Sequence, residues 1–205
     1  MSYFPGVTSS ASKVPAVERI LDAATRLFAE KGFAGASTRL IAETAGLNIA
    51  TVNYHVGGKR DLYLAVMERA ADRERHALEE VMRASAPTAE DAHRLADRYL
   101  DFCVEHPEIA ALWLRRWLSD AEDVTSLEAE RVRPLVARIV DLAQHVAGPE
   151  ADVEYAVWSV IWCVHGFVRG GVLDDRGARR RGDDQPALQR FRRTLHHLVD
   201  GLLDL

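Results

Sequence analysis

Cysteine is scarce in this sequence, and its two occurrences follow no structural pattern. Cys103 and Cys163 lie far apart, and neither belongs to a CxxC or Cys/His spacing of the kind that holds a metal ion. We therefore expect neither a zinc site nor a framework of disulfides, and the sequence predicts no metal and no other cofactor. So few cysteines favour a reducing compartment, and we expect a cytoplasmic protein.

Long apolar segments are also absent. The opening stretch, MSYFPGVTSSASK, does not lead from a charged start into an apolar core, so a signal peptide is not expected. The longest uncharged apolar run extends from Tyr155 to Val168 and is bounded by Glu154 and Arg169. This run is too short to span a bilayer, so a buried helix is the better interpretation and no membrane partner is expected.

Positive charge is not in excess over the chain as a whole. A net charge of -5 argues against a protein that coats nucleic acid by bulk charge. The charge is unevenly distributed, however, because residues 1–60 carry a net +3 and residues 61–205 carry a net -8. The first third of the chain is therefore the part suited to a polyanion.

Alternation with a period of two residues, which marks half-buried strands, is nearly absent. Apolar residues instead recur at intervals of three and four from about residue 16 to the end, which predicts an all-α fold. The chain of 205 residues has room for a small domain joined to a larger one. The longer predicted helices cover residues 15–31, 59–84, 89–105, 107–119, 126–147, 151–173 and 186–204. We expect Pro134 to kink or split one of them.

Two short helices are predicted between the first and the fourth. One begins at Ser37 or Thr38, and Gly46 supplies the turn that ends it. The next is capped by Asn48, runs over residues 49–56 and stops at two glycines. Three helices with a glycine at the second turn and a polar third helix are typical of a helix-turn-helix, in which the third helix enters the major groove of DNA.

The stretch NIATVNYHVGGKR, residues 48–60, concentrates side chains that suit DNA. Thr51, Asn53, Tyr54 and His55 can form hydrogen bonds to phosphate oxygens or base edges, and Lys59 adds a charged backbone contact. Three of them have a plain structural alternative: Tyr54 as a half-buried core aromatic, His55 as a surface histidine, and Lys59 with Arg60 as a solvated helix start. Their joint occurrence in a net positive segment behind a capped helix favours DNA binding.

The run ILDAATRLFAEKGFAGASTRLIAETAGLNIATVNYHVGGKRDLYL, residues 20–64, resembles the DNA-binding domain of the TetR family of bacterial transcriptional regulators. The resemblance implies a homodimer formed through the last two helices and a C-terminal domain that binds a small effector. Most such proteins are repressors whose effector moves the two recognition helices. The expected domains are a disordered arm over residues 1–12, a helix-turn-helix domain over 13–60 and an effector-binding and dimerisation domain over 61–205.

The family pattern also implies roles for single residues. It makes Thr38, His55 and Lys59 phosphate contacts and places Ala50 and Thr51 nearest the bases. The partner is then double-stranded operator DNA, expected as an inverted repeat.

Two positions depart from the family pattern. Tyr54 matches the second of two adjacent aromatic residues that are common in the family. Asn53 stands at the first of these positions, where many members have tyrosine, so whether Asn53 reads a base or a phosphate is left open. Residues 56–58 replace a more usual phenylalanine and polar pair, which suggests a looser hinge before the fourth helix.

All four tryptophans lie in the C-terminal part, as two pairs spaced four residues apart that each share a helix face. Aromatic side chains on one helix face can form the wall of a pocket that suits a small hydrophobic ligand. The candidate effector pocket comprises Tyr99, Phe102, His106, Trp113, Trp117, Trp158, Trp162 and His165. Aromatic residues at this spacing are most often core residues, so which tryptophan pair lines a pocket is left open.

The last helix carries apolar residues over a wide face and therefore needs a partner. With the resemblance in mind, the candidate dimer interface comprises Trp158, Trp162, Phe191, Leu195, Leu198 and Leu202. Three other features have plain interpretations: Arg115 and Arg116 as a solvated face, the arginines of residues 174–184 as a loop neutralised by its own aspartates, and the adjacent His196 and His197 as unsuited to a metal ion.

Two alternatives to an effector-released repressor remain. One is a regulator or activator without a small ligand, controlled by a protein partner. The other is an enzyme with Cys163 as nucleophile, although His165 two residues away diverges from it on a helix and the apolar surroundings raise the pKa of the thiol. Effector, operator, target genes and the sign of regulation cannot be read from the sequence.

Overall fold

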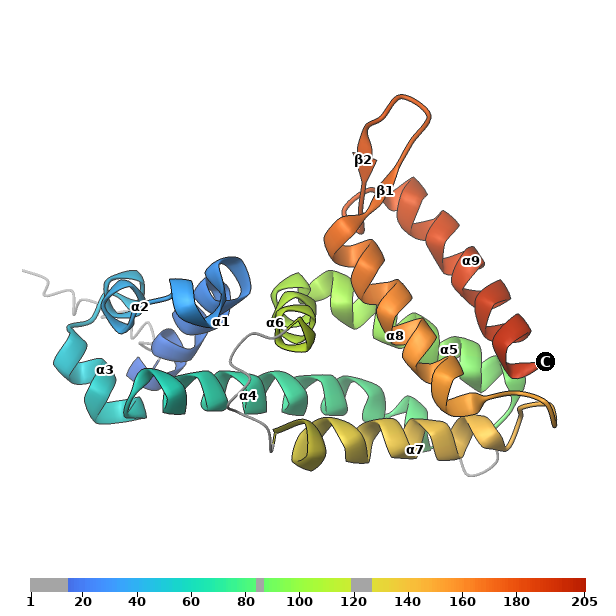
Figure 1. The fold of residues 1–205 in the computed structure, drawn as a ribbon, viewed down its shortest axis with the longest axis horizontal. Coiled ribbons are helices and arrows are strands. Elements are labelled where there is room, and N and C mark those ends of the chain that lie inside the picture. The colour runs from blue at the N-terminus through green and yellow to red at the C-terminus, as the bar shows by residue number, and fades with distance from the viewer. Residues whose placement is uncertain (1–14, 84–86, 119–126) are drawn as a thin grey trace, which may run out of the picture.

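The computed structural model describes residues 15–83, 87–118 and 127–205, so the arm predicted over residues 1–12 lies outside the described residues. The chain is helical, as predicted (Figure 1). Its helices are α1 (Ala16–Gly35), α2 (Thr38–Ala45), α3 (Ile49–Val56), α4 (Lys59–Glu79), the 3-10 helix η1 (Val81–Arg83), α5 (Ala89–Glu105), α6 (Pro107–Trp117), the π-helix η2 (Glu128–Val132), α7 (Arg133–Gln144), α8 (Val153–Gly170) and α9 (Gln185–Leu203).

The helices form two regions joined by α4 and α6. At one end α1 packs against α2, α3 and the start of α4, and α3 lies at the edge of the molecule (Figure 1). At the other end α8 packs against α5, α6, α7 and α9. Because α6 also packs against α1, the two regions share one continuous hydrophobic core.

Several helix ends differ from the prediction. The first helix continues for one more turn past Gly32, whose φ of 73° interrupts it. The helix predicted over 59–84 ends at Glu79 and gives way to the short η1, and the one predicted over 151–173 ends at Gly170. Pro134 lies in the first turn of α7, where a missing backbone N–H costs nothing, so the segment is divided between η2 and α7.

The charged segment after α8 is not a plain loop. Val172–Leu173 and Arg179–Arg180 pair as short antiparallel strands β1 and β2, which form a hairpin that projects from the molecule (Figure 1). Arg180 binds Asp174 at 2.9 Å and Asp184 at 3.2 Å, so the aspartates do neutralise an arginine of this segment. None of the helices in the described residues is both long and apolar enough to cross a membrane.

Candidate nucleic-acid interface and effector cavity

The turn between α2 and α3 is fixed by local sequence and by α1. The Ser37 hydroxyl accepts a hydrogen bond from Leu40 N at 3.1 Å and so caps α2. Gly46 ends α2 with a φ of 65°, a left-handed conformation that favours glycine. The Arg19 guanidinium of α1 donates to Ala45 O at 2.5 Å and to Gly46 O at 3.2 Å, which ties the turn to the first helix.

The recognition helix α3 is capped and anchored within the protomer. The Asn48 side-chain oxygen accepts hydrogen bonds from Thr51 N at 2.8 Å and from the Thr51 hydroxyl at 3.0 Å. Val52 is fully buried and is the residue that holds the helix against its neighbours. Because the Thr51 hydroxyl donates to its own cap, its free lone pairs can still accept a hydrogen bond from a base.

We expect Asn48→Ala to lower the free energy of unfolding by about 1 kcal/mol, because it removes the N-cap of α3. Urea denaturation measures the change. Arg176→Ala, a substitution in the exposed hairpin, serves as the control and should leave stability unchanged. An Asn48→Ala protein as stable as the wild type would contradict the capping role.

The outer side of α3 is exposed over most of the residues predicted to meet DNA, whereas Thr51 is partly buried. Ala50, Asn53 and His55 are exposed, and Tyr54 retains 84% of its surface. The Tyr54 and His55 rings contact edge to face at a centroid distance of 5.2 Å. Thr38, at the start of α2, is partly buried. An exposed tyrosine of this size is unusual in a packed helix and marks a surface built for contact.

Lys59 begins α4 beside the end of α1. Its Nζ donates to Ala34 O at 3.3 Å and lies 4.6 Å from the centre of the Phe33 ring. The lysine is therefore held at the edge of the helix-turn-helix domain before any DNA is present. Its remaining N–H groups stay available to a phosphate.

Asp61 was missed in the sequence reading and shapes the turn before α4. Its carboxylate accepts a hydrogen bond from Gly58 N at 3.0 Å. Gly57 has a φ of 70°, and a Cβ there would lie 2.7 Å from the Asp61 carboxylate. An acid three residues after the N-cap residue, here Gly58, is a known capping signal, and it would have revealed this contact. The turn at Gly57 and Gly58 is thus held by the Asp61 carboxylate and has no room for a side chain at Gly57.

A cavity of about 110 Å³ lies in the C-terminal region between α4, α5, α6, α7, α8 and α9. Of the eight predicted pocket residues, Tyr99, Trp113, Trp117 and Trp158 line it. Trp113 and Trp117 stack at 6.3 Å, and Trp117 meets Trp158 edge to face at 5.7 Å. Trp158 of the second pair therefore lines the cavity together with Trp113 and Trp117 of the first pair. The sequence predicted a pocket lined by one pair or the other, not by members of both.

The other four predicted pocket residues lie outside the lining of this cavity. Trp162 is on the outer side of α8 and is 52% exposed. His106 joins α5 to α6, where its ring contacts Phe102 at 5.1 Å. His165 is buried next to two lining residues. Its ring stacks on Trp117 at a centroid distance of 5.1 Å, and its Nε2 is 2.7 Å from the Tyr99 hydroxyl.

Glu74 of α4 is a cavity residue that the sequence reading did not single out. Burial raises the pKa of its carboxyl to about 7, and the nearby Trp113 indole and Tyr99 hydroxyl offset only part of this rise. Burial likewise lowers the pKa of His165 to about 4, which keeps that imidazole neutral. A lone glutamate on an amphipathic helix gives no signal in the sequence, because only the packing of the neighbouring helices places it in the cavity lining.

The interpretation of Arg115 and Arg116 as a solvated face is wrong. Arg115 reaches α1, where it donates to Ala29 O at 2.8 Å and to Glu30 O at 2.7 Å. Arg116 is only 7% exposed and forms a two-bond ion pair with Glu128. The end of α6 is enclosed by α1 on one side and η2 on the other, so both arginines bind within the protein.

Part of the predicted dimer interface is buried within one protomer. Leu195 is 1% exposed, Leu202 lines the cavity and Phe191 stacks on Phe167 of α8 at 4.0 Å. Helices α5 and α8 thus cover most of the apolar face of α9. Among the large hydrophobic residues of α8, Tyr155 and Trp162 remain exposed at 66% and 52%.

The arrangement around Cys163 does not suit a nucleophile. Cys163 is exposed, whereas His165 is buried and engaged with Tyr99, so the two side chains do not meet. Partial desolvation by the neighbouring side chains nevertheless raises the pKa of the Cys163 thiol, which lowers its reactivity. His196 binds Asp97 at 2.9 Å. Within the described part of the chain, no group of three or more His, Cys, Asp or Glu side chains is arranged for a metal ion.

Comparison with known proteins gives relatives for both regions. The family profile of bacterial regulatory proteins of the tetR family matches residues 20–66. The transcriptional repressor AcnR of Corynebacterium glutamicum is 30% identical over 135 residues, which cover 62% of this chain and 67% of the relative. The dual regulator CecR of Shigella flexneri is 39% identical over 97 residues, which are 47% of this chain but only 37% of that relative.

Solved structures extend the likeness over nearly the whole fold. A TetR-like regulator from Rhodococcus sp. RHA1 superposes with a TM-score of 0.69 at 21% identity, and the match covers 93% of this chain and 98% of that one. At this identity the likeness concerns the fold. The match to AcnR, together with the family profile over the helix-turn-helix, shows that the chain belongs to the TetR family of bacterial regulatory proteins.

Proposed function

We propose that this protein is a repressor that a small hydrophobic effector releases from its operator. The observation that carries the proposal is the pairing of an exposed recognition helix at one end with an apolar, tryptophan-lined cavity at the other. The two are joined by α4 and α6, which contribute residues to the cavity and pack against α1.

On DNA, a dimer would place two copies of α3 in successive major grooves of an inverted repeat. Contacts of Thr38, His55 and Lys59 with phosphates would hold the register. Thr51 and Tyr54 would select the sequence from the exposed side of the helix. Asn53 is exposed beside them and is a short side chain suited to adenine.

The dimer would form through the outer faces of α8 and α9. Tyr155 and Trp162 are large, exposed and on the same side of α8, and apolar surface of this kind marks an interface. On α9 the exposed positions Thr194, His197 and Gly201 fall at intervals of three and four. A Cβ on Gly201 would meet no neighbouring atom, which leaves room for a second helix to approach closely.

Release would operate through α6. Trp113 lines the cavity, and two residues further along the same helix Arg115 holds the end of α1 by two backbone carbonyls. A ligand that displaces α6 would therefore shift α1 and the recognition helix attached to it. The ligand can shift the balance only by its difference in affinity between the two arrangements.

We expect Thr51→Ala to cost about 1 to 3 kcal/mol of operator affinity, chiefly at one base step, because a base contact carries sequence information. Competition binding with operators substituted at single positions measures the effect. An equal loss on every sequence, including random DNA, would instead assign Thr51 to the phosphate backbone.

The proposed control by an effector is tested with a panel of hydrophobic compounds. A compound that binds the native state must raise the melting temperature, and the same compound should release operator DNA in a gel-shift assay. If no compound raises the melting temperature although operator binding is intact, the alternative of a regulator controlled by a protein partner is favoured.

A further inference from the structure

The layer formed by α8 and α9 carries opposite charge at its two ends. Exposed arginines without an ion pair among the described residues make up the basic end, at the hairpin: Arg169, Arg181, Arg190 and Arg193. Exposed acids make up the acidic end, where the turn before α8 meets the end of α9: Glu150, Asp152, Glu154 and Asp204. About 27 Å of α8 separates the two ends (Figure 1). A surface with this charge separation is complementary to a copy of itself turned end for end.

The acidic end is hollowed. A surface depression lies at the turn between α7 and α8 and is lined by Gln144 and residues 147–154. Its lining holds three carboxylates and no lysine, arginine or histidine. Residues 169–193, by contrast, contain eight arginines against four aspartates, in a chain whose net charge is -5. The positive groups that the depression lacks within its own protomer are therefore in excess at the basic end.

An exposed stripe on α8 connects the two ends. Tyr155, Trp162, Gly166 and Arg169 are exposed at intervals of seven, four and three residues, which places them on one face of the helix. Trp162 is the midpoint, seven residues from Tyr155 and seven from Arg169. A Cβ on Gly166 would meet no neighbouring atom, so a second helix has room to approach closely beside Trp162.

The charges decide the direction in which two such stripes can pair. A two-fold interface uses the same surface on both protomers. Parallel α8 helices would bring the two basic ends together, and like charges across an interface are unfavourable. Antiparallel helices that cross at Trp162 bring each basic end to the acidic end of the other protomer. Glu154 lies on the same side of the stripe as Arg169, because 15 residues are slightly more than four helical turns.

We propose that a second copy of this chain binds across α8 in antiparallel orientation, so that the hairpin and basic end of each protomer dock on the acidic end of the other. The proposal rests on the proposed function, since it specifies how that dimer is assembled. Arg169 faces Glu154 of the partner subunit in this arrangement, and the contact occurs twice by symmetry. Val172 and Leu173, exposed on β1 just beyond Arg169, are covered by the same contact.

The charge pairing is tested by the dimer dissociation constant of the full chain without DNA, measured by sedimentation velocity over a concentration series. Arg169→Glu and Glu154→Arg should each raise this constant about tenfold at physiological salt, because each places like charges together twice. The protein with both substitutions should return to within about twofold of the wild type, since the pair is then restored with its signs exchanged. Arg73→Glu, the same charge reversal on the exposed side of α4, is the matched control and should have no effect.

The orientation is tested by oxidative cross-linking of Tyr155→Cys and Arg169→Cys proteins that both carry Cys163→Ser. An antiparallel pair centred on Trp162 brings position 155 of one protomer next to position 169 of the other. A disulfide forms only where the two Cα atoms lie within about 7 Å. We expect a disulfide-linked dimer in a mixture of the two proteins after subunit exchange, and none in either protein alone.

Three results would each overturn the proposal. They are a linked dimer in either protein alone, no linked dimer in the mixture, and a dissociation constant that the paired reversal fails to restore. A wild-type protein that remains monomeric at every concentration would overturn it as well. Failure of the proposed function would appear separately, as absence of sequence-specific binding to DNA by a protein that dimerises in this orientation.

Discussion

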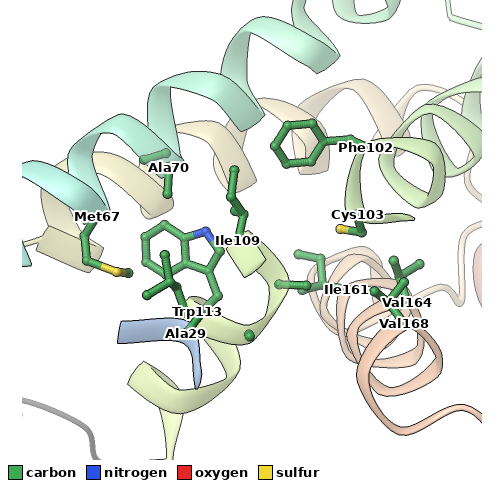
Figure 2. Packing of buried hydrophobic residues seen from close by; sticks show 14 of the residues in the cluster. Ala29, Met67, Ala70, Phe102, Cys103, Ile109, Trp113, Ile161, Val164 and Val168 are labelled. Carbon is green, nitrogen blue, oxygen red and sulfur yellow. The ribbon is translucent and has the colours of Figure 1, made fainter. Parts of the chain in front are cut away.

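Replacing Trp113 by alanine is expected to lower the free energy of unfolding by about 3 to 5 kcal/mol. Trp113 is only 2% exposed, and its ring lies between α4 and α1, beside Met67, Ala70 and Ala29 (Figure 2). Its removal opens a cavity at the junction of the two regions that the neighbouring helices can close only in part. The loss should therefore affect the helix-turn-helix domain and the C-terminal region together.

Urea denaturation followed by circular dichroism measures this change, with Trp162→Ala as the matched control. Trp162 is half exposed, so its removal leaves no internal cavity. Its effect on stability should depend on protein concentration if it lies in the dimer interface, whereas the Trp113→Ala effect should persist at every concentration. Equal losses in the two variants at high dilution would contradict the central packing role of Trp113.

The second large effect is expected for Lys59→Ala. This substitution should weaken binding to operator and random DNA alike and lower the slope of log K against log salt by about 1 for each protomer. The reason is that a phosphate contact contributes affinity and counterion release but no sequence information. Fluorescence anisotropy over a series of salt concentrations measures both quantities.

Lys59 also binds Ala34 O and the Phe33 ring, so loss of folding has to be separated from loss of DNA contact. A thermal melt of each variant provides that separation. Arg176→Ala in the hairpin removes the same charge far from α3 and should leave DNA affinity unchanged (Figure 1). A Lys59→Ala protein with unaltered affinity at low and moderate salt would show that the docking is wrong.

The sequence predicted the fold class and the recognition region because their signals are local. Caps such as Ser37 and Asn48 and the left-handed Gly46 act within a few residues, and each lies where the pattern placed it. The family pattern over residues 20–64 carried the same information independently. Ends of helices were less accurate, since fraying and proline positions depend on neighbouring elements.

The C-terminal region was less predictable because its roles depend on which helices meet. From the sequence, Arg115 was expected at the surface, but α6 packs against α1 and brings Arg115 to the carbonyls of α1. Leu195 was expected at the dimer interface, but α5 and α8 cover it within the protomer. Glu74 is one acid among many on α4, and only the assembled cavity distinguishes it. Spacing along one helix reports a shared face but not the element that covers that face.

The central claim is sequence-specific recognition of DNA by the exposed side of α3. The most direct test is fluorescence anisotropy of the purified protein on promoter DNA of its own and adjacent genes, at physiological salt with excess nonspecific competitor. We predict nanomolar binding that resists the competitor and is lost in Tyr54→Ala. Binding to these promoters no tighter than to random DNA, or undiminished in Tyr54→Ala, would contradict it.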